Sequence, residues 1–577
     1  MAFLSRTPYG LQQYYCVVMK SLDALTIGRL PGLTAFLATV TVMPWIAYEP
    51  INVPKLAVIS AGGFMALGAI LANHVDYMQK QYRTLLIIGL AFIIDLTLVL
   101  IISGTNFNQE FFGTFGRATG YLAYLALTFL LITAAITANS FTLHRFVGWL
   151  LGAGFISIIY GVIQTLKLDP INWVNQYSPV IGFLGNPNFQ SSFVGLSGVM
   201  AFAMLIGDEV AVAYRAGYVL YIVLAAYVIQ GTLSQQGFFV LTGGISVVTF
   251  IRIVTSKVKS LSFPFSLLGL VGAVLVVAGT LKRGPLAAIL YEDSVTYRGD
   301  YWRAGWKMSM ENPFFGVGLD SYGDWYRRAR TAEATLRRGP DIVSNAAHNV
   351  LLDLSSNGGF PLMIIYLFLM LLVAVSTIKV IKRNSGFNPA FSGLVAVWVA
   401  YQAQSIISLN QLGLAIWGWI ISGLIIGYEI NTREFVLIHK RPIKTKSARV
   451  ISNQKIMPKT ILGMFIGLMV GIALGAPTLI TASKYKSGLE TGDANIVQNI
   501  ANSWPQDASR SVKIAIILQE NKLQEQALDV IEEASRRFPD SFDVWKVLAS
   551  LEGTPKELVA EAKTQMKRLD PYNPTLK

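Results

Sequence analysis

The sequence predicts an all-α, polytopic membrane protein, and three observations support that fold class. Apolar residues make up 53% of the 577 residues and charged residues only 14%, whereas a soluble protein carries roughly a quarter charged residues. Runs of about 18 or more apolar residues recur, each long enough to cross a hydrocarbon core of roughly 30 Å as a helix. The net charge of +14 lies largely in short loops between these runs, which indicates membrane topology and attraction to anionic lipid rather than nucleic-acid binding.

We expect about thirteen membrane-spanning helices in a cytoplasmic (inner) membrane. Lysine and arginine collect in the loops on the side of the N-terminus, so the positive-inside rule places that end in the cytoplasm. The opposite short loops contain little more than Arg117 and Lys167. The expected spans are approximately 33–48, 54–73, 84–104, 120–140, 147–166, 190–207, 217–233, 237–251, 264–281, 359–378, 390–409, 412–430 and 460–481.

This orientation divides the chain into three parts. Residues 1–31 form a cytoplasmic N-terminus, 32–481 a membrane domain with a large outer loop at 282–358, and 482–577 an outer helical module. No cleavable signal peptide is expected, because the N-terminus is polar and the first long apolar run begins only near Leu33.

The module at 482–577 has amphipathic stretches at about 508–520, 523–537, 541–551 and 555–569. Four short helices of this length resemble tetratricopeptide-type hairpins, with room for about two units. Two roles stay open from the sequence: a helical cap over the outer loop, or a docking surface for a partner protein or a second subunit.

Histidine and cysteine usage limits the possible chemistry. The single cysteine, Cys16, excludes an internal disulfide, and no Cys/His cluster has zinc-ligand spacing. We therefore expect no metal site and no cofactor. Three of the four histidines, His74, His144 and His439, fall on the cytoplasmic side, which leaves only His348 outside.

His348 is the first candidate catalytic residue. It precedes a helix start, Asn349-Val-Leu-Leu-Asp-Leu, that leads into the span beginning near Gly359. An imidazole held at the outer membrane face can accept a proton from an attacking hydroxyl near neutral pH. The alternative is a structural or surface histidine.

Arginines in the same loop are candidate phosphate ligands, because guanidinium forms paired hydrogen bonds with phosphate and keeps its charge. Arg298 and Arg303 lie beside Trp302 and Trp306, a spacing that also suits an amphipathic helix at the bilayer surface. A further group is balanced by nearby acids, and we expect a solvated, flexible stretch there: Arg327, Arg328, Arg330, Arg337 and Arg338.

Two other outward elements carry candidate binding residues. Asn186 and Asn188, in a Gly- and Pro-containing stretch before the sixth span, could hydrogen-bond sugar hydroxyls or cap the helix. Arg117, where the fourth span begins, could bind phosphate or extend to lipid headgroups. Asp95 lies within the third span, where a carboxylate is costly enough to suggest a function.

In combination these motifs resemble the signature of the O-antigen ligase/polymerase superfamily, over about residues 30–430. The motifs are Arg298…Trp302, Asn312-Pro-Phe-Phe-Gly-Val-Gly318, His348-Asn349-x-x-Leu352-Asp353 with Gly359, Gly185-Asn-Pro-Asn-Phe189, and Gly116-Arg117-x-x-Gly120.

The resemblance implies a multi-span glycosyltransferase on the outer face of the membrane. Such enzymes transfer a glycan from a polyprenyl (undecaprenyl) pyrophosphate carrier to a lipid, a protein hydroxyl or another glycan. It associates the positions of His348, Arg298 and Arg117 with activity and with the pyrophosphate. Together with the residues described above, we predict His348 and Arg298 as catalytic, and Arg117, Arg303, Asn186, Asn188, Gln235 and Asn349 as substrate-binding. Gln235 stands where the family commonly has an arginine, so it can hydrogen-bond phosphate but brings no charge.

We therefore expect metal-independent transfer, in which arginines stabilise the departing diphosphate and His348 orients the acceptor hydroxyl. The metal-dependent plan needs acids in the first outer loop, which offers only Glu49. Two alternatives stay open: a glycan polymerase of the same superfamily, and a lipid-linked glycan transporter. A transporter typically shows inverted repeats and paired intramembrane charges, and the sequence shows neither.

Overall fold

The computed structural model describes residues 26–73, 80–173, 178, 180–291, 293–384, 386–433 and 458–576. Within these ranges the chain is helical and contains no strand. The expected cytoplasmic positions of His74 and His439 lie outside the described residues, as do Cys16 and most of the expected N-terminal segment.

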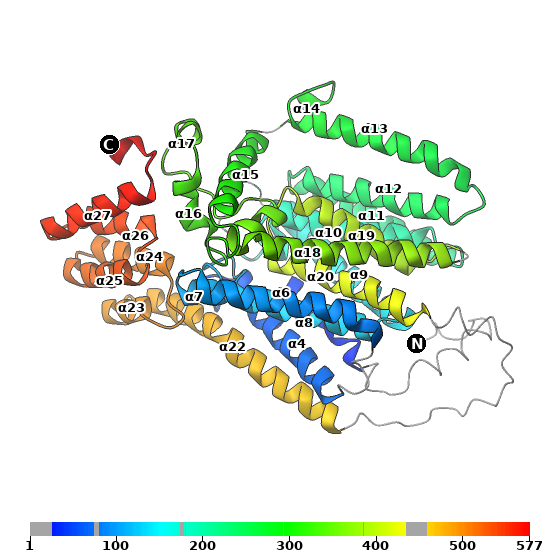
Figure 1. Cartoon of the computed structure of the whole chain (residues 1–577), viewed down its shortest axis with the longest axis horizontal. Helices are drawn as coiled ribbons and strands as arrows, with labels where there is room; N and C mark the ends of the chain where they lie inside the picture. Colours follow the sequence, from blue (N-terminus) through cyan, green and yellow to red (C-terminus); the bar gives the residue numbers. More distant parts are fainter. Residues whose placement is uncertain are drawn as a thin grey trace.

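A multi-pass helical bundle forms the body of the protein (Figure 1). Ten helices in the described ranges are long and apolar enough to cross a membrane, which confirms the polytopic all-α class. They are α4 (Asn52–Ala72), α6 (Arg83–Ile102), α9 (Ser140–Thr165), α10 (Pro187–Leu205), α11 (Val212–Gly231), α12 (Gln236–Val254), α13 (Ser262–Thr280), α18 (Val350–Arg383), α20 (Leu412–Asn431) and α22 (Pro458–Thr491).

The other three expected spans correspond to shorter apolar helices. These helices are α3 (Leu30–Val40), α8 (Tyr121–Thr137) and α19 (Pro389–Ser405). At roughly 1.5 Å per residue, α3 is too short to cross the hydrocarbon core.

A buried lysine donates hydrogen bonds to backbone carbonyl groups at the C-terminal end of α3. Lys55 on α4 is fully buried, and its Nζ donates hydrogen bonds of 2.9 Å to the carbonyl oxygens of Thr39 and Thr41. Such bonds are needed where a helix ends inside an apolar bundle. The sequence had indicated only Asp95 as a clear intramembrane charge, and Lys55 corrects that interpretation.

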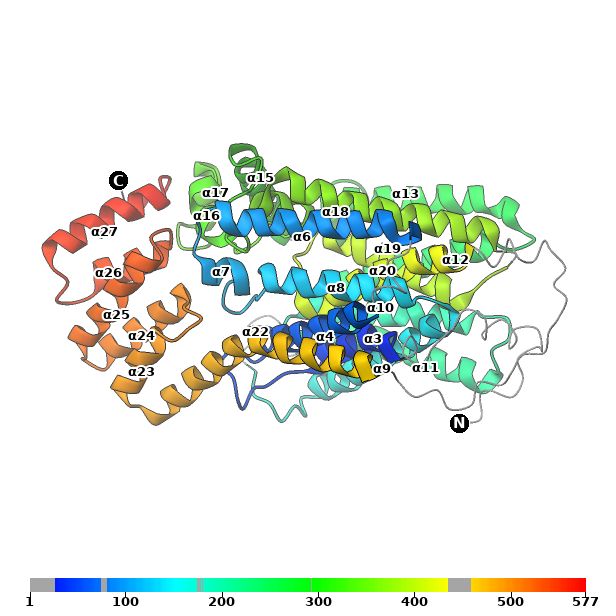
Figure 2. The same ribbon diagram turned by 60° about the horizontal axis from the view of Figure 1, so that its bottom comes forward.

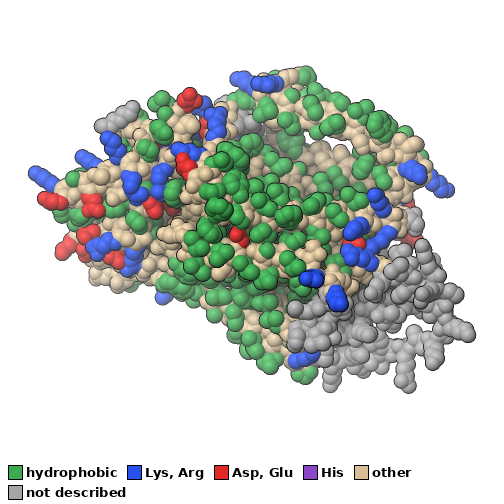
Figure 3. Space-filling model, viewed as in Figure 1, with side chains coloured by type: hydrophobic (Ala, Val, Ile, Leu, Met, Phe, Trp, Pro, Cys, Tyr) green, Lys and Arg blue, Asp and Glu red, His purple; other side chains and the backbone are tan. Residues whose placement is uncertain are grey.

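Helix α20 lies at the centre of the bundle, and its apolar stretch is entirely buried. The apolar stretch of α13, in contrast, is not buried at all. Figure 3 shows apolar side chains across the middle of the molecule, with charged side chains gathered towards its two ends. This distribution suits a protein whose middle faces lipid.

Helix α22 is continuous over 34 residues, so the expected boundary at residue 481 falls within a helix. Beyond it lie α23 (Ala494–Ala501), α24 (Ala508–Glu520), α25 (Gln524–Arg537), α26 (Phe542–Ser550) and α27 (Lys556–Leu569). The last four match the four expected helices, and α23 is additional. They share a second hydrophobic core that includes Tyr485, Trp545 and Leu569.

The 282–358 segment folds into short helices at the same end of the molecule as this C-terminal module (Figures 1 and 2). It contains α14 (Ala287–Leu290), α15 (Asp293–Glu311), α16 (Tyr322–Ala329), α17 (Ala332–Arg338) and the first turns of α18. The short helix α7 (Phe107–Phe112) lies at this end too.

Candidate functional site

A break in α18 organises the candidate site. Gly359 has a φ of 80° inside α18, and a Cβ there would lie 2.3 Å from the carbonyl oxygen of Phe314. The loop with the sequence Pro-Phe-Phe-Gly-Val-Gly runs along this break. The Val317 amide donates to the carbonyl of Ser356 at 2.8 Å, and the Phe360 amide donates to the carbonyl of Pro313 at 2.8 Å. The motif glycines are therefore needed where two backbones meet.

His348 lies immediately before α18 with a left-handed φ of 53°. The next residue, Asn349, caps the helix by accepting hydrogen bonds from two first-turn amides. On the other side, the Ala347 amide donates to Asp353 Oδ1 at 2.7 Å. The imidazole ring lies 5.4 Å from the ring of Tyr301 on α15. The position of His348 is thus set by a helix cap and a carboxylate.

The positive charges of three arginines act on the pKa of His348. Burial, together with the positive charges of Arg298, Arg117 and Arg338, lowers the pKa of His348 to about 4. The imidazole is therefore neutral at pH 7. Arginines that converge on a neutral imidazole form a binding site suited to a multivalent anion.

Arg117 links two loops of this site. Its Nε lies 3.2 Å from Asp320 Oδ1, and its guanidinium donates to the carbonyl oxygen of Asn345. Asp320 also accepts a hydrogen bond from the Thr114 amide at 2.8 Å. The loop that carries Arg117 is therefore fixed against the segment that leads to His348.

A small cavity lies beside these residues. Its lining includes Arg117, Asp320, Asp353, Tyr124 and Asn410. Neither His348 nor Arg298 lines it, although Asp353 connects the cavity to the backbone next to His348. One oxygen of Asp353, Oδ2, has no hydrogen-bond partner among the described residues.

A family model described as O-antigen ligase matches residues 220–367. Over these residues the chain is similar to the O-antigen ligase family, and we call them the O-antigen ligase domain. No curated protein matches the chain. The O-antigen ligase domain runs from α11 into α18 and includes Arg298, the 313–318 loop and His348, whereas Arg117 and the C-terminal module lie outside the matched residues.

The structure groups Arg298 and Arg117 with His348, Asn349 adjoins His348, and the other candidate residues lie elsewhere. Arg298 and Arg117 both act on His348. Arg303, also in the O-antigen ligase domain, has a side chain 60% exposed and lies 3.9 Å from Asp300. Asn349 serves as a helix cap, which leaves its oxygen already bonded.

The two asparagines of the Gly-Asn-Pro-Asn motif have structural contacts. Asn186 caps α10, and Asn188 Oδ1 accepts a hydrogen bond from Ser234 at 2.7 Å. That bond places the motif beside the stretch that contains Gln235. All three residues are described, and none lines the cavity beside Arg117.

The expectation of a solvated arginine stretch at 327–338 was wrong. Arg327 and Arg330 are buried, and Arg337 donates to both oxygens of Asp300, at 2.7 and 2.9 Å. The Arg338 guanidinium stacks over Tyr297 and donates to the hydroxyl of Tyr301. These arginines hold the fold of the O-antigen ligase domain, and Arg338 also acts on His348.

Sequence reasoning missed three site residues. Asp353 stood within the quoted His-Asn motif, which could have indicated it. Arg338 and Asp320 had no such local signal, because their contacts join segments far apart in the chain.

Glu110 gives a pH-dependent prediction for this region. Its side chain is fully buried and accepts hydrogen bonds from the Leu319 amide at 3.0 Å and the Ser103 hydroxyl at 2.5 Å. Burial raises its pKa to about 7. Because the folded pKa lies above the unfolded value, this group's contribution to stability falls as pH rises from about 4.5 to about 7.

We therefore expect Glu110→Gln to raise the Tm relative to the natural protein, by an amount that grows between pH 4.5 and pH 7 and then stays level. Thermal unfolding in detergent at four pH values measures it. A difference in Tm that shrinks as pH rises would contradict the assignment.

Proposed function

We propose that this protein is a membrane glycosyltransferase of the O-antigen ligase type. It transfers a glycan from a polyprenyl pyrophosphate carrier to an acceptor hydroxyl on the outer face of the cytoplasmic membrane. The observation that carries the proposal is the neutral imidazole of His348 beside Arg298, Arg117 and Arg338. Helices α15 and α17, which carry Arg298 and Arg338, lie at the end of the bundle that holds the C-terminal module (Figure 1).

In this proposal the arginines bind the pyrophosphate of the donor. Bond cleavage at the anomeric carbon leaves extra negative charge on the diphosphate, and fixed guanidinium groups stabilise that charge more strongly than water does. The acceptor oxygen forms the new bond to the anomeric carbon, and its proton passes to His348. In-line displacement would invert the anomeric configuration.

In this mechanism, binding of the donor raises the pKa of His348, the proton acceptor. In the free protein, burial and three positive charges hold the pKa of His348 near 4, which makes it a weak base. A bound pyrophosphate offsets those charges, and a nearby opposite charge raises the pKa of a cationic acid. His348 thus becomes a stronger base only when the donor is present.

A pH profile tests this coupling. We expect the acidic limb of kcat/KM, which reports the free enzyme, at about pH 4. The acidic limb of kcat, which reports the bound enzyme, should lie at higher pH. Initial rates between about pH 3 and about pH 9 measure both. Coincident limbs, or a kcat limb at lower pH, would contradict donor-induced activation.

Acceptor identity separates a ligase from a polymerase of the same superfamily. Mass spectrometry of glycolipids, glycoproteins and polysaccharides from a strain that lacks the chain addresses it. We expect one glycoconjugate class to lose its glycan while carrier-linked glycan accumulates. An unchanged glycan profile in all three classes would contradict the proposed function.

A further inference from the structure

A buried ion cluster joins the end of the C-terminal module to the 282–358 segment. Asp570, directly after α27, has a fully buried side chain. Its two oxygens lie 2.9 and 2.7 Å from Arg330 Nη2, and its Oδ2 lies 3.2 Å from Arg327 Nη1. The Arg330 side chain is only 1% exposed. Arg327 also lies 3.6 Å from Asp543 Oδ1 of the same module, but that carboxylate is 63% exposed. Asp570 is thus the buried carboxylate that the two guanidinium groups share.

The same arginines hold the segment that leads to His348, residues 340–348, which we call the histidine segment. Arg327 Nη1 donates to the carbonyl oxygen of Pro340 at 2.6 Å, and Arg330 Nη2 donates to the same oxygen at 3.0 Å. Arg330 Nη1 donates to the carbonyl oxygen of Ile342 at 3.3 Å. A continuous set of hydrogen bonds thus runs from Asp570 to the start of the histidine segment.

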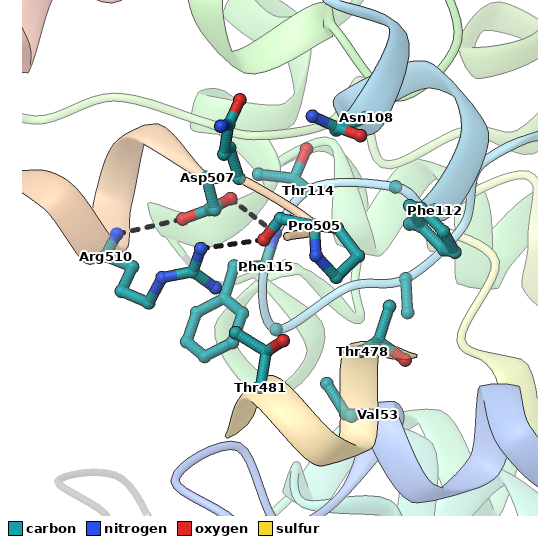
Figure 4. Close-up of a pocket in the computed structure, with 14 residues that line it drawn as sticks. Val53, Asn108, Phe112, Thr114, Phe115, Thr478, Thr481, Pro505, Asp507 and Arg510 are labelled. Carbon is teal, nitrogen blue, oxygen red and sulfur yellow. Dashed lines mark hydrogen bonds between the residues drawn. The ribbon is translucent and has the colours of Figure 1, made fainter. Parts of the chain in front are cut away.

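The module also contacts the loop that carries Arg117 (Figure 4). Asp507 Oδ2 accepts a hydrogen bond from the Phe115 amide at 3.3 Å, while its Oδ1 caps α24. Phe112 and Trp504 meet edge to face with ring centroids 5.3 Å apart. The module therefore contacts both loops from which His348 and Arg117 extend.

From these contacts we propose that Asp570 is a positioning residue for the candidate active site. Through Arg327 and Arg330 it fixes the histidine segment, and the C-terminal module thereby aligns His348 with Arg117. The proposal rests on the proposed function only for its kinetic readout.

Hydrogen exchange tests the structural half independently of activity. We expect Asp570→Asn, in the full-length protein in nanodiscs, to accelerate exchange in peptides that span 340–353. Two guanidinium groups would lose their shared charge partner and release the loop carbonyls. Unchanged exchange in those peptides would overturn the proposal.

Lys546→Ala is the matched control. The Lys546–Asp341 ion pair joins the same module to the same segment at 2.7 Å, but its side chains are 49% and 71% exposed. Exposed pairs contribute little, so this variant should exchange as the natural protein does. Equal acceleration in both variants would mean that the interface as a whole, not Asp570, holds the histidine segment, which overturns the proposal.

Kinetics test the functional half. We expect Asp570→Asn to lower kcat by about 10-fold to 10²-fold, with donor KM within about twofold, because misplacing a reacting group acts on the chemical step. Arg330→Lys keeps the charge but loses the paired contacts, so it should show a smaller decrease in the same direction. If Asp570→Asn does not fold, the kinetics of Arg330→Lys replace it as the test.

The outcomes separate the two proposals. Faster exchange with an unchanged kcat overturns the positioning role. If Asp570→Asn exchanges faster but the natural protein transfers no glycan, the proposed function is overturned. The conclusion that the module holds the histidine segment then remains.

Discussion

His348→Ala is expected to lower kcat for glycan transfer by roughly 10²–10⁴-fold, the usual contribution of a positioned general base. The structure supports a large effect, because the imidazole is neutral and held by a helix cap on one side and the Ala347–Asp353 bond on the other. Donor KM should change little, since the arginines make most of the contacts to pyrophosphate in this mechanism. Initial rates with purified protein measure both quantities.

His144→Ala is the matched control. His144 lies near the start of α9, where its ring nitrogen contacts the carbonyl oxygen of Ser140 at 2.6 Å in an exposed position. This variant should transfer glycan at the natural rate. If His348→Ala folds normally and retains more than half of the natural kcat, the imidazole has no part in the chemistry.

Arg298→Ala should have the second largest effect. Removal of one guanidinium weakens the ground-state contact with pyrophosphate and the stabilisation of the leaving group, so donor KM should rise and kcat should fall. Together we expect kcat/KM to decrease by about 10²-fold or more, as for other fixed groups that stabilise transition-state charge. The acidic limb of kcat/KM should also move to higher pH, because the Arg298 charge lowers the pKa of His348.

Arg303→Ala is the control on the same helix. Both residues lie on α15, but the Arg303 side chain is largely exposed. Its effect on kcat/KM should be less than about threefold, the range of a peripheral surface contact. If Arg303→Ala matches Arg298→Ala, the donor lies on the other face of α15 and the assignment of the phosphate site is wrong.

Hydropathy predicted the course of the chain well, because a helix that faces lipid must be apolar for most of its length. It failed at α3, where the apolar run continues past Val40 but the helix does not. Lys55 donates hydrogen bonds to the carbonyl oxygens of Thr39 and Thr41, where the helix ends. A hydropathy average over 33–48 contains no sign of a lysine that lies on another helix.

The sequence also indicated the residues that lie close together along the chain, such as His348 and the motif around it. It misjudged the arginines at 327–338, because their partners Asp300 and Asp570 lie elsewhere in the chain. A run of arginines has the same composition whether it is solvated or paired. Only the fold brings Asp570 to it and Arg338 to Tyr301.

The decisive experiment uses proteoliposomes. They contain the natural protein, a polyprenyl pyrophosphate-linked oligosaccharide and a candidate acceptor. The quantity to follow is polyprenyl pyrophosphate released from its glycan, measured together with glycan gained by the acceptor. Transfer predicts that the two increase in equal amounts, and that both are lost in His348→Ala. Movement of the intact donor across the bilayer, with no carrier released, would instead show a transporter.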